Sequence, residues 1–194
     1  MPPLSAKECD ALQLGLAHGI NTVSLSFANR GADVDEIRVA AGPNVTVIAK
    51  IECRNGLVYL DAIAEKADAL LIDRGDLSRE VPIAQIPSLQ KMITAKAKSH
   101  GRKVYVATNL LESMVTAPPP TRAEVNAVFN TLLDGVDGLV LAAETAIGDN
   151  PIGCANMIVK LIHEFERDDA LSLDSPPRLG MGSPSLLVDP PGGE

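Results

Sequence analysis

Charged and hydroxyl residues follow three apolar runs of the sequence. They lie in the segments IAKIE at 48–52, DRGD at 73–76 and ATN at 107–109. In a parallel α/β protein the carboxyl ends of the strands meet at one rim, where such folds bind ligands and catalyse reactions. We therefore expect a functional site where these three apolar runs end.

Lys50, Glu52 and Asp76 are the candidates for a metal and anion site. Lys50 and Glu52 are two residues apart, so on a strand both side chains point to the same side. Glu52 and Asp76 offer carboxylate oxygens, the ligands that Mg²⁺ or Mn²⁺ prefers, and Lys50 could hold an anionic substrate against the ion. The spacing also allows a purely structural interpretation, in which Lys50 and Glu52 form a surface ion pair and Asp76 caps a helix.

Gly75 and Thr108 extend this candidate site toward a substrate carboxylate. A short helix is expected to start near Leu77, and the amides of Gly75, Asp76 and Leu77 would then point at an anion. Thr108 follows the apolar run KVYVA and could relay a proton or orient a substrate. An ordinary turn at Gly75 and a capping role for Thr108 are the alternatives, so both residues count only together with the carboxylates.

Other polar residues lie near the same rim. Ser26, Arg30 and Glu144 fall at or just beyond expected strand ends, where each by itself favours a structural role. Asp73, Glu112 and Arg122 have no assigned partner, and a solvated surface explains them equally well. The three histidines have no carboxylate at a consistent spacing, which gives no support to a histidine-based mechanism. The three cysteines show no CxxC or Cys/His pattern, which argues against a zinc site or a disulfide framework.

The composition is that of a globular protein with an aliphatic core. The 194 residues are 46% hydrophobic and only 3% aromatic, and the formal net charge is -8. Such an acidic chain is not expected to bind nucleic acid, because nucleic-acid-binding proteins concentrate Lys and Arg on one face. No stretch is typical of a secretion signal or a membrane span, so we expect a cytoplasmic protein with no membrane partner.

Helical periodicity alternates with short apolar runs over most of the chain. Units of a helix followed by a strand are expected at 11–27, 60–75 and 128–144. Two further strands are expected at 45–51 and 103–107, and further helices at 33–41, 82–100 and 151–166. Continuous apolar runs such as Leu139–Leu141 are typical of strands buried on both faces. Thr121 and Glu124 form a capping-box pattern at a helix start. The alternation predicts an α/β fold with about five strands in one parallel sheet.

Ser, Pro and Gly dominate the sequence after Arg167. Such a composition offers few groups that can be buried together. We therefore divide the chain into a folded domain at 1–168 and a carboxyl-terminal tail at 169–194, which is expected to be disordered. Docking of the tail through its apolar residues 186–188 is the alternative.

Taken in sequence order, these segments resemble the latter part of the pyruvate kinase barrel. The resemblance covers about residues 4–167 and includes VIAKIECRNGL, RGDLSREVP, GRKVYVATNLLESM, PPPTRAE and LLDGVDGLVLAAETAIGDNP. It implies a partial TIM (β/α)₈ barrel that contains units four to eight. The amino-terminal units, the inserted lid domain and the carboxyl-terminal domain of that family are not expected in this chain.

The resemblance also implies a role for each candidate residue. Lys50 resembles the family's catalytic lysine at the transferred phosphoryl group and the enolate oxygen, and Glu52 and Asp76 resemble its divalent-metal ligands. The backbone amides of Gly75 and Asp76 would hold the substrate carboxylate, and Thr108 would lie beside the enolate carbon that is protonated. Mg²⁺ and an ammonium group stabilise an enolate oxyanion as it forms.

The function implied by the resemblance is binding of Mg²⁺ or Mn²⁺ and of phosphoenolpyruvate or pyruvate. The family's K⁺ ligands and the arginines that face the nucleotide belong to the absent first part. K⁺ is therefore not expected to bind this chain alone, and phosphoryl transfer with ADP or ATP would require completion of the barrel. The alternatives are a metal-dependent enolate lyase or decarboxylase acting on a pyruvate-type substrate, and a non-catalytic fragment or interaction subunit. Because an incomplete barrel exposes two sheet edges, we expect a homo-oligomer or a companion chain.

Several residues differ from the usual pattern of the family. Asp73 stands where alanine usually precedes RGD, Ser78 where glycine usually follows GDL, and Asn109 where glutamine is usual. Asp73 is the most consequential of these differences. A third carboxylate could bind a metal more tightly or repel the negative charge of the substrate.

Overall fold

Five parallel strands form a single sheet in the computed structural model, which describes residues 4–174. The strands follow one another across the sheet in sequence order: β1 (Thr22–Leu25), β2 (Thr46–Ile51), β3 (Ala69–Asp73), β4 (Lys103–Ala107) and β5 (Gly138–Val140). This arrangement confirms the α/β class and the strand number expected from the sequence. Within the described part of the chain, β1 and β5 form the two edges of the sheet.

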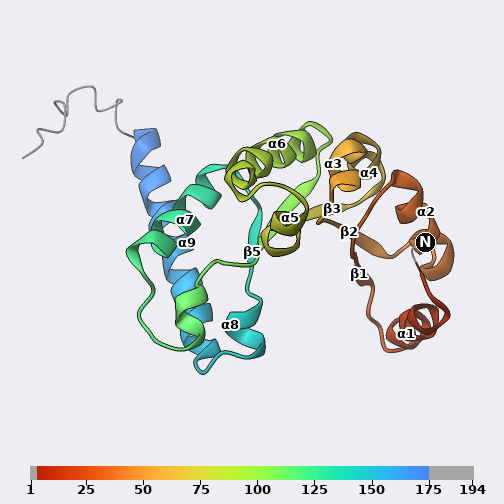
Figure 1. The fold of residues 1–194 in the computed structure, drawn as a ribbon, viewed down its shortest axis with the longest axis horizontal. Coiled ribbons are helices and arrows are strands. Elements are labelled where there is room, and N and C mark those ends of the chain that lie inside the picture. Colours follow the sequence, from red (N-terminus) through yellow and green to blue (C-terminus); the bar gives the residue numbers. More distant parts are fainter. Residues whose placement is uncertain (1–3, 175–194) are drawn as a thin grey trace, which may run out of the picture.

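Helices lie between consecutive strands and after the last one. The α-helices are α1 (Ala6–Ala17), α2 (Gly31–Ala41), α3 (Arg54–Val58), α4 (Leu60–Lys66), α5 (Arg74–Glu80), α6 (Ile86–Ser99), α7 (Arg122–Leu133), α8 (Ala143–Ala146) and α9 (Pro151–Asp174), and two 3₁₀ turns are η1 (Ile83–Gln85) and η2 (Glu112–Val115). Figure 1 shows α2, α4 and α6 one after another along the same side of the sheet, with α7 and α9 beyond β5. No helix within residues 4–174 combines the length and the apolar character needed to cross a membrane.

Capping boxes fix the starts of two helices. At α7 the Thr121 hydroxyl accepts a hydrogen bond from the Glu124 amide, and the Glu124 carboxylate accepts one from the Thr121 amide. Ser5 and Glu8 form the same pair of hydrogen bonds at α1. Both pairs satisfy first-turn amides that have no partner within the helix. The start of α7 expected from the sequence is therefore confirmed.

Two other helix boundaries differ from the expectation. α5 begins at Arg74 rather than near Leu77, because Asp73 acts as its N-cap. α9 runs to Asp174, beyond the expected end at residue 166 and into the segment assigned to the tail. The rest of the expected tail, 175–194, lies outside the described residues.

One face of the sheet is more open than the sequence indicates. β1 alternates between the exposed Thr22 and Ser24 and the buried Leu25, and all three residues of β5 are half-buried. The prediction that these strands are buried on both faces was therefore wrong, because α2, α4 and α6 lie along one side only (Figure 1). β3, in the middle of the sheet, is buried along its whole length.

Two clusters of buried aliphatic side chains hold the elements together. The larger one joins β1 to β4 with α2, α4 and α6, and it includes Val34, Val47, Ile63, Leu70 and Ile93. The second joins the segment after β4 with α7 and α9, and it includes Leu110, Leu111, Val128, Cys154 and Ile158. Together the two clusters hold the helices in place. The residues at the strand ends lie in or next to the connections between each strand and the helix that follows it.

Gly31 lies where α2 packs against α4. A Cβ atom added there would lie 2.5 Å from the carbonyl oxygen of Ala62, a backbone atom of α4. The backbone of α4 cannot move away from this clash as a flexible side chain could. We therefore expect Gly31→Ala to lower the free energy of unfolding, measured by urea denaturation, by about 2 kcal/mol. The control is Gly15→Ala in α1, where the new Cβ would meet the Ile20 side chain at an ordinary 3.7 Å. That variant should be neutral or stabilised by up to about 1 kcal/mol, and equal effects of both changes would contradict the expectation.

Candidate functional site

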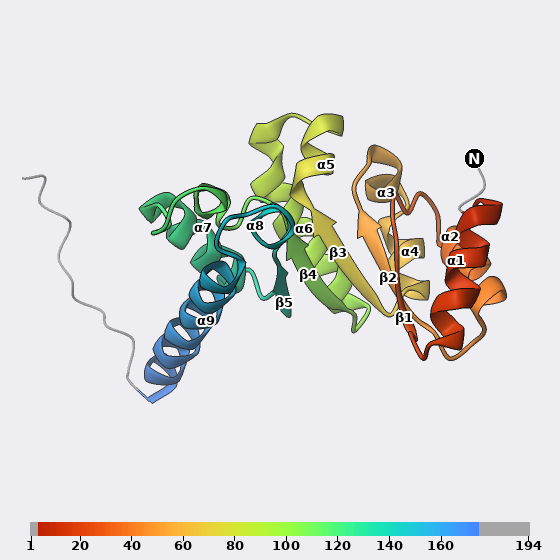
Figure 2. The ribbon, with the colours of Figure 1, turned by 90° about the horizontal axis from the view of Figure 1, so that it is seen from below.

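The ends of β2 and β3 bring Lys50, Glu52, Asp73 and Asp76 together. Lys50 Nζ lies 2.5 Å from Glu52 Oε1 and 3.4 Å from Asp73 Oδ2. One carboxylate oxygen each of Glu52, Asp73 and Asp76 lies within 4.8 Å of the other two. The strand register explains this proximity, because Lys50 pairs with Leu71 and the residues two further on, Glu52 and Asp73, are then level with each other. α3 and α5, which follow these two strands, lie at the same end of the sheet in Figure 2.

Glu52 is fully buried and held from one side only. Its Oε2 accepts a hydrogen bond of 2.6 Å from the backbone amide of Phe27, which lies just beyond β1 and has a positive φ of 50°. Its Oε1 is buried and receives no well-aligned hydrogen bond, and its close contact is the ammonium of Lys50. A buried carboxylate oxygen with unused acceptor capacity is suited to a cation.

Asp73 is the N-cap of α5, and its carboxylate lies among three donors. Oδ1 lies 3.4 Å from the amide nitrogen of Asp76 and 3.2 Å from the hydroxyl of Thr108, and Oδ2 faces Lys50. The alternative interpretation of Asp76 as a helix cap was therefore wrong, because the helix begins earlier than expected. The amides expected to point at an anion are also partly engaged, since that of Gly75 donates to Thr108 Oγ1 at 2.8 Å.

Lys50 carries the positive charge of this cluster. Burial alone would lower its pKa, but the adjacent carboxylates of Glu52 and Asp73 more than offset this effect and raise the pKa above the ordinary lysine value. The ammonium form therefore persists at neutral pH. A permanent positive charge next to a buried carboxylate suits the binding of an anion, not the role of a general base.

Thr108 is held in a strained conformation directly after β4. It is a β-branched residue with φ of 67°, and its neighbour Asn109 has φ of 53°. The Arg74 guanidinium donates to the carbonyl oxygen of Thr108 from Nε at 3.1 Å and from Nη2 at 2.5 Å. This conformation directs the Thr108 hydroxyl toward Gly75 and Asp73. Such strain is concentrated at ligand-binding sites, where the surrounding structure enforces it.

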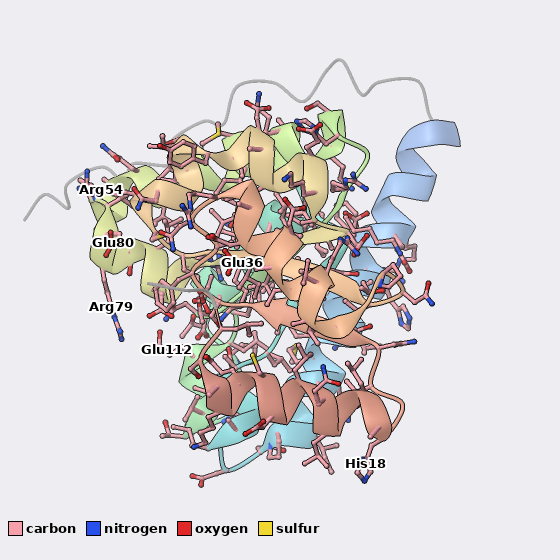
Figure 3. The ribbon with its side chains drawn as sticks, turned by 90° about the vertical axis from the view of Figure 1, so that its right-hand side faces the viewer. His18, Glu36, Arg54, Arg79, Glu80 and Glu112 are labelled. Carbon is pink, nitrogen blue, oxygen red and sulfur yellow. The ribbon has the colours of Figure 1, made fainter. Side chains whose placement is uncertain are left out.

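Asp76 is the most accessible of the three carboxylates. Its side chain is 32% exposed, and Oδ1 lies 3.2 Å from Nη1 of Arg79, which projects away from the ribbon in Figure 3. Three carboxylates are the hard oxygen ligands that Mg²⁺ and Mn²⁺ favour. One carboxylate oxygen of each residue lies close enough to the other two that movement of the side chains would allow them to hold one cation. The donor set therefore fits a divalent cation.

A small cavity opens beside this cluster. Its volume is about 160 Å³, and Gly75, Thr108, Asn109 and Glu112 line it together with 142–144. Gly75 and Thr108 thus face both the carboxylate cluster and the cavity. A small organic acid placed there would lie next to the helix start of α5.

The other polar residues of the rim lie outside the cluster. Arg30 pairs with Asp33 at the start of α2, Glu112 accepts a hydrogen bond from Asn109, and Ser26 and Arg122 are exposed. His18, which follows α1, lies far from Arg79 in Figure 3.

Glu144 has a structural role, in agreement with the interpretation favoured from the sequence, which did not identify its partners. Its side chain is 2% exposed, and it accepts hydrogen bonds from the amides of Leu111 at 3.0 Å and Ala142 at 2.9 Å. It thereby ties the segment after β4 to the segment after β5. Arg74 and Phe27 were also not identified. The Phe27 amide donates to Glu52 and the Arg74 guanidinium donates to the backbone carbonyl of Thr108, and such contacts with backbone groups leave no signal in the pattern of residue types.

A parallel sheet with charged residues gathered at the carboxyl ends of its strands is the arrangement in which α/β barrels place their functional sites. A family model described as "Pyruvate kinase, barrel domain" matches residues 1–155. The chain belongs to the pyruvate kinase family, as the resemblance in the sequence implied, and its sheet is part of that family's barrel.

Curated relatives show the same relationship. The chain is 40% identical over 168 residues to pyruvate kinase of Methylorubrum extorquens, and the matched segment covers 87% of this chain and 35% of the relative. It is 41% identical over 169 residues to pyruvate kinase 2 of Synechocystis, covering 86% and 29%. It is 38% identical over 169 residues to human pyruvate kinase PKLR, also covering 86% and 29%. The chain thus spans about a third of the length of the curated relatives it matches.

Proposed function

We propose that the cluster at the ends of β2 and β3 binds a divalent cation, Mg²⁺ or Mn²⁺, and a pyruvate-type carboxylate. Together with the parts of a pyruvate kinase that this chain does not span, the site would serve phosphoryl transfer between phosphoenolpyruvate and ADP. The observation that supports the proposal is the convergence of three carboxylates and one ammonium at one strand end, beside a small cavity.

Glu52 and Asp76 are the residues that would hold the cation, and Asp73 lies beside them. When bound, the cation would supply positive charge that neutralises oxygens of the substrate. Glu52 is preorganised for this task by the Phe27 amide, and Asp76 is free enough to adjust. Preorganised ligands lose little conformational freedom on binding, which favours affinity.

Lys50 would place its ammonium against negative charge that develops on the substrate. Removal of a phosphoryl group from phosphoenolpyruvate leaves an enolate, whose oxygen carries the new charge. Lys50 is already positioned by Glu52 and Asp73, so little reorganisation is needed during the reaction. Preorganised charge of this kind is commonly the largest contribution to transition-state stabilisation.

Thr108 and the start of α5 would orient the substrate. The Thr108 hydroxyl accepts a hydrogen bond from the Gly75 amide and faces the cavity, where it could pass a proton to or from the enolate carbon. The helix start provides backbone amides for a carboxylate. The start of α5 would then bind the carboxylate of the substrate. Lys50 would stabilise the charge of the enolate, and Thr108 would transfer its proton.

Loss of cation binding on substitution of Glu52 tests this proposal. We expect Glu52→Gln to weaken Mn²⁺ binding at least about tenfold, because a neutral amide replaces the buried anionic ligand at similar volume. Mn²⁺ binding is measured by electron paramagnetic resonance, and a circular dichroism spectrum checks that the variant is folded. Glu36→Gln, on the exposed side of α2, is the matched control and should bind Mn²⁺ like the unmodified chain. Equal Mn²⁺ affinity in Glu52→Gln would contradict the proposed site.

A further inference from the structure

We propose that Asp73 is a built-in competitor of the carboxylate ligand. In the structure its side chain occupies the donors that an external carboxylate would use, and it has to leave them before the ligand can bind. This inference rests on the proposed function, and it concerns how the site is regulated.

The contacts of Asp73 are those of a bound carboxylate. One oxygen lies near the Asp76 amide and the Thr108 hydroxyl, at 3.4 Å and 3.2 Å, and the other lies 3.4 Å from Lys50 Nζ. A helix-start amide, a hydroxyl and an ammonium together form a typical binding site for a small carboxylate. The Asp73 side chain is only 11% exposed, so it fills this place and leaves little room for a second carboxylate.

These contacts are long enough for Asp73 to be displaced. All three exceed the usual length of charge-assisted hydrogen bonds, which is about 2.7–2.9 Å. The Thr108 hydroxyl also lies 2.6 Å from the carbonyl oxygen of Ala107, so its single hydrogen is divided between two acceptors. The Asp73 side chain is therefore positioned by weak contacts that a ligand can break.

The charge balance favours the same conclusion. Three carboxylates face one lysine within the cluster, Arg79 is 83% exposed, and the Arg74 guanidinium is engaged by the backbone carbonyls of Thr108 and Asn109. An incoming carboxylate would therefore meet net negative charge. A divalent cation held by Glu52 and Asp76 would reduce this repulsion, while Asp73 still occupies the donors of the carboxylate. The arrangement predicts an order of binding, in which the cation precedes the carboxylate.

Oxalate binding in the presence of saturating Mn²⁺ tests the inference. Isothermal titration calorimetry compares the unmodified chain with Asp73→Ala, which removes both the competing group and its charge. We expect oxalate to bind Asp73→Ala at least about tenfold more tightly. Asp73→Asn keeps the volume and the ability to cap α5 but removes the charge, so its oxalate affinity should lie between the other two. Glu36→Ala is the control for loss of a remote negative charge and should leave oxalate affinity unchanged.

The outcomes separate this inference from the proposed function. If oxalate binds the unmodified chain and Asp73→Ala equally well, or binds the variant more weakly, Asp73 is not a competitor and the proposed function stands. If neither protein binds oxalate although both are folded by circular dichroism, the proposed carboxylate site is wrong and the inference falls with it. Should Asp73→Ala fail to fold, Asp73→Asn carries the comparison, and affinity equal to that of the unmodified chain overturns the inference.

Discussion

Lys50→Met is expected to slow exchange of the pyruvate methyl protons with solvent at least about 100-fold, which corresponds to roughly 3 kcal/mol of transition-state stabilisation. Exchange requires an enolate, and Lys50 is the ammonium that the structure places beside the carboxylate cluster. Its raised pKa keeps it charged at neutral pH. Methionine has similar length but no charge, so the change removes the electrostatic contribution with little loss of packing.

The exchange rate is measured by proton nuclear magnetic resonance in deuterium oxide at saturating Mg²⁺. Saturation is needed because removal of Lys50 leaves three carboxylates without their neighbouring cation, which alters the affinity for metal. Lys7→Met, an exposed change in α1, is the control and should exchange protons at the unmodified rate. An unchanged rate in Lys50→Met would remove Lys50 from the proposed mechanism.

Glu144→Gln is expected to lower the free energy of unfolding by about 2–3 kcal/mol at neutral pH. Glu144 is buried and accepts hydrogen bonds from the amides of Leu111 and Ala142. A glutamine side chain can present its oxygen to one of these amides, but its NH₂ group then faces the other donor. Leaving a buried donor without an acceptor costs about 1–3 kcal/mol, and loss of the charged acceptor adds to this cost.

The pH dependence of this difference provides a second measurement. Burial alone would raise the pKa of Glu144, but hydrogen bonds from the backbone, chiefly from Leu111, outweigh it and lower the pKa below the ordinary glutamate value. A lowered pKa in the folded state means that the stabilisation is present above the ordinary value and is lost as pH falls through the folded pKa. Urea denaturation should therefore show the gap between the unmodified chain and Glu144→Gln narrowing in acid. Glu36→Gln, an exposed change in α2, is the control and should unfold at neutral pH like the unmodified chain. A constant gap for Glu144→Gln would contradict the assigned cause.

The sheet and the proximity of Lys50, Glu52 and Asp76 could be predicted from the sequence. Apolar runs mark the strands, and parallel strands place the residues that follow them at one rim, so the ends of β2 and β3 had to meet. Residue type then indicates which of these side chains could bind an ion. The same reasoning could not find the role of Asp73, because that role depends on whether α5 begins at Arg74 or a turn later, and both starts satisfy the local pattern.

Backbone conformation accounts for the rest of what the sequence did not reveal. The amide that holds Glu52 comes from Phe27, and the conformation of Thr108 is enforced by Arg74. Phe27 and Thr108 both have positive φ, which residues of their type rarely adopt. The burial of Glu144 could not be predicted, because burial depends on contacts between segments far apart in the sequence. Such features follow from tertiary structure and cannot be derived from local composition.

The order of the strands has a consequence for how this protein is made. Each strand hydrogen-bonds to the one that precedes or follows it along the chain, so no pairing has to wait for a distant segment. Each pairing therefore closes only a short loop and costs little conformational entropy. Assembly can advance from one repeat to the next as the polypeptide leaves the ribosome. A sheet built in this way is modular, since a repeat gained or lost at either margin leaves every remaining ladder intact.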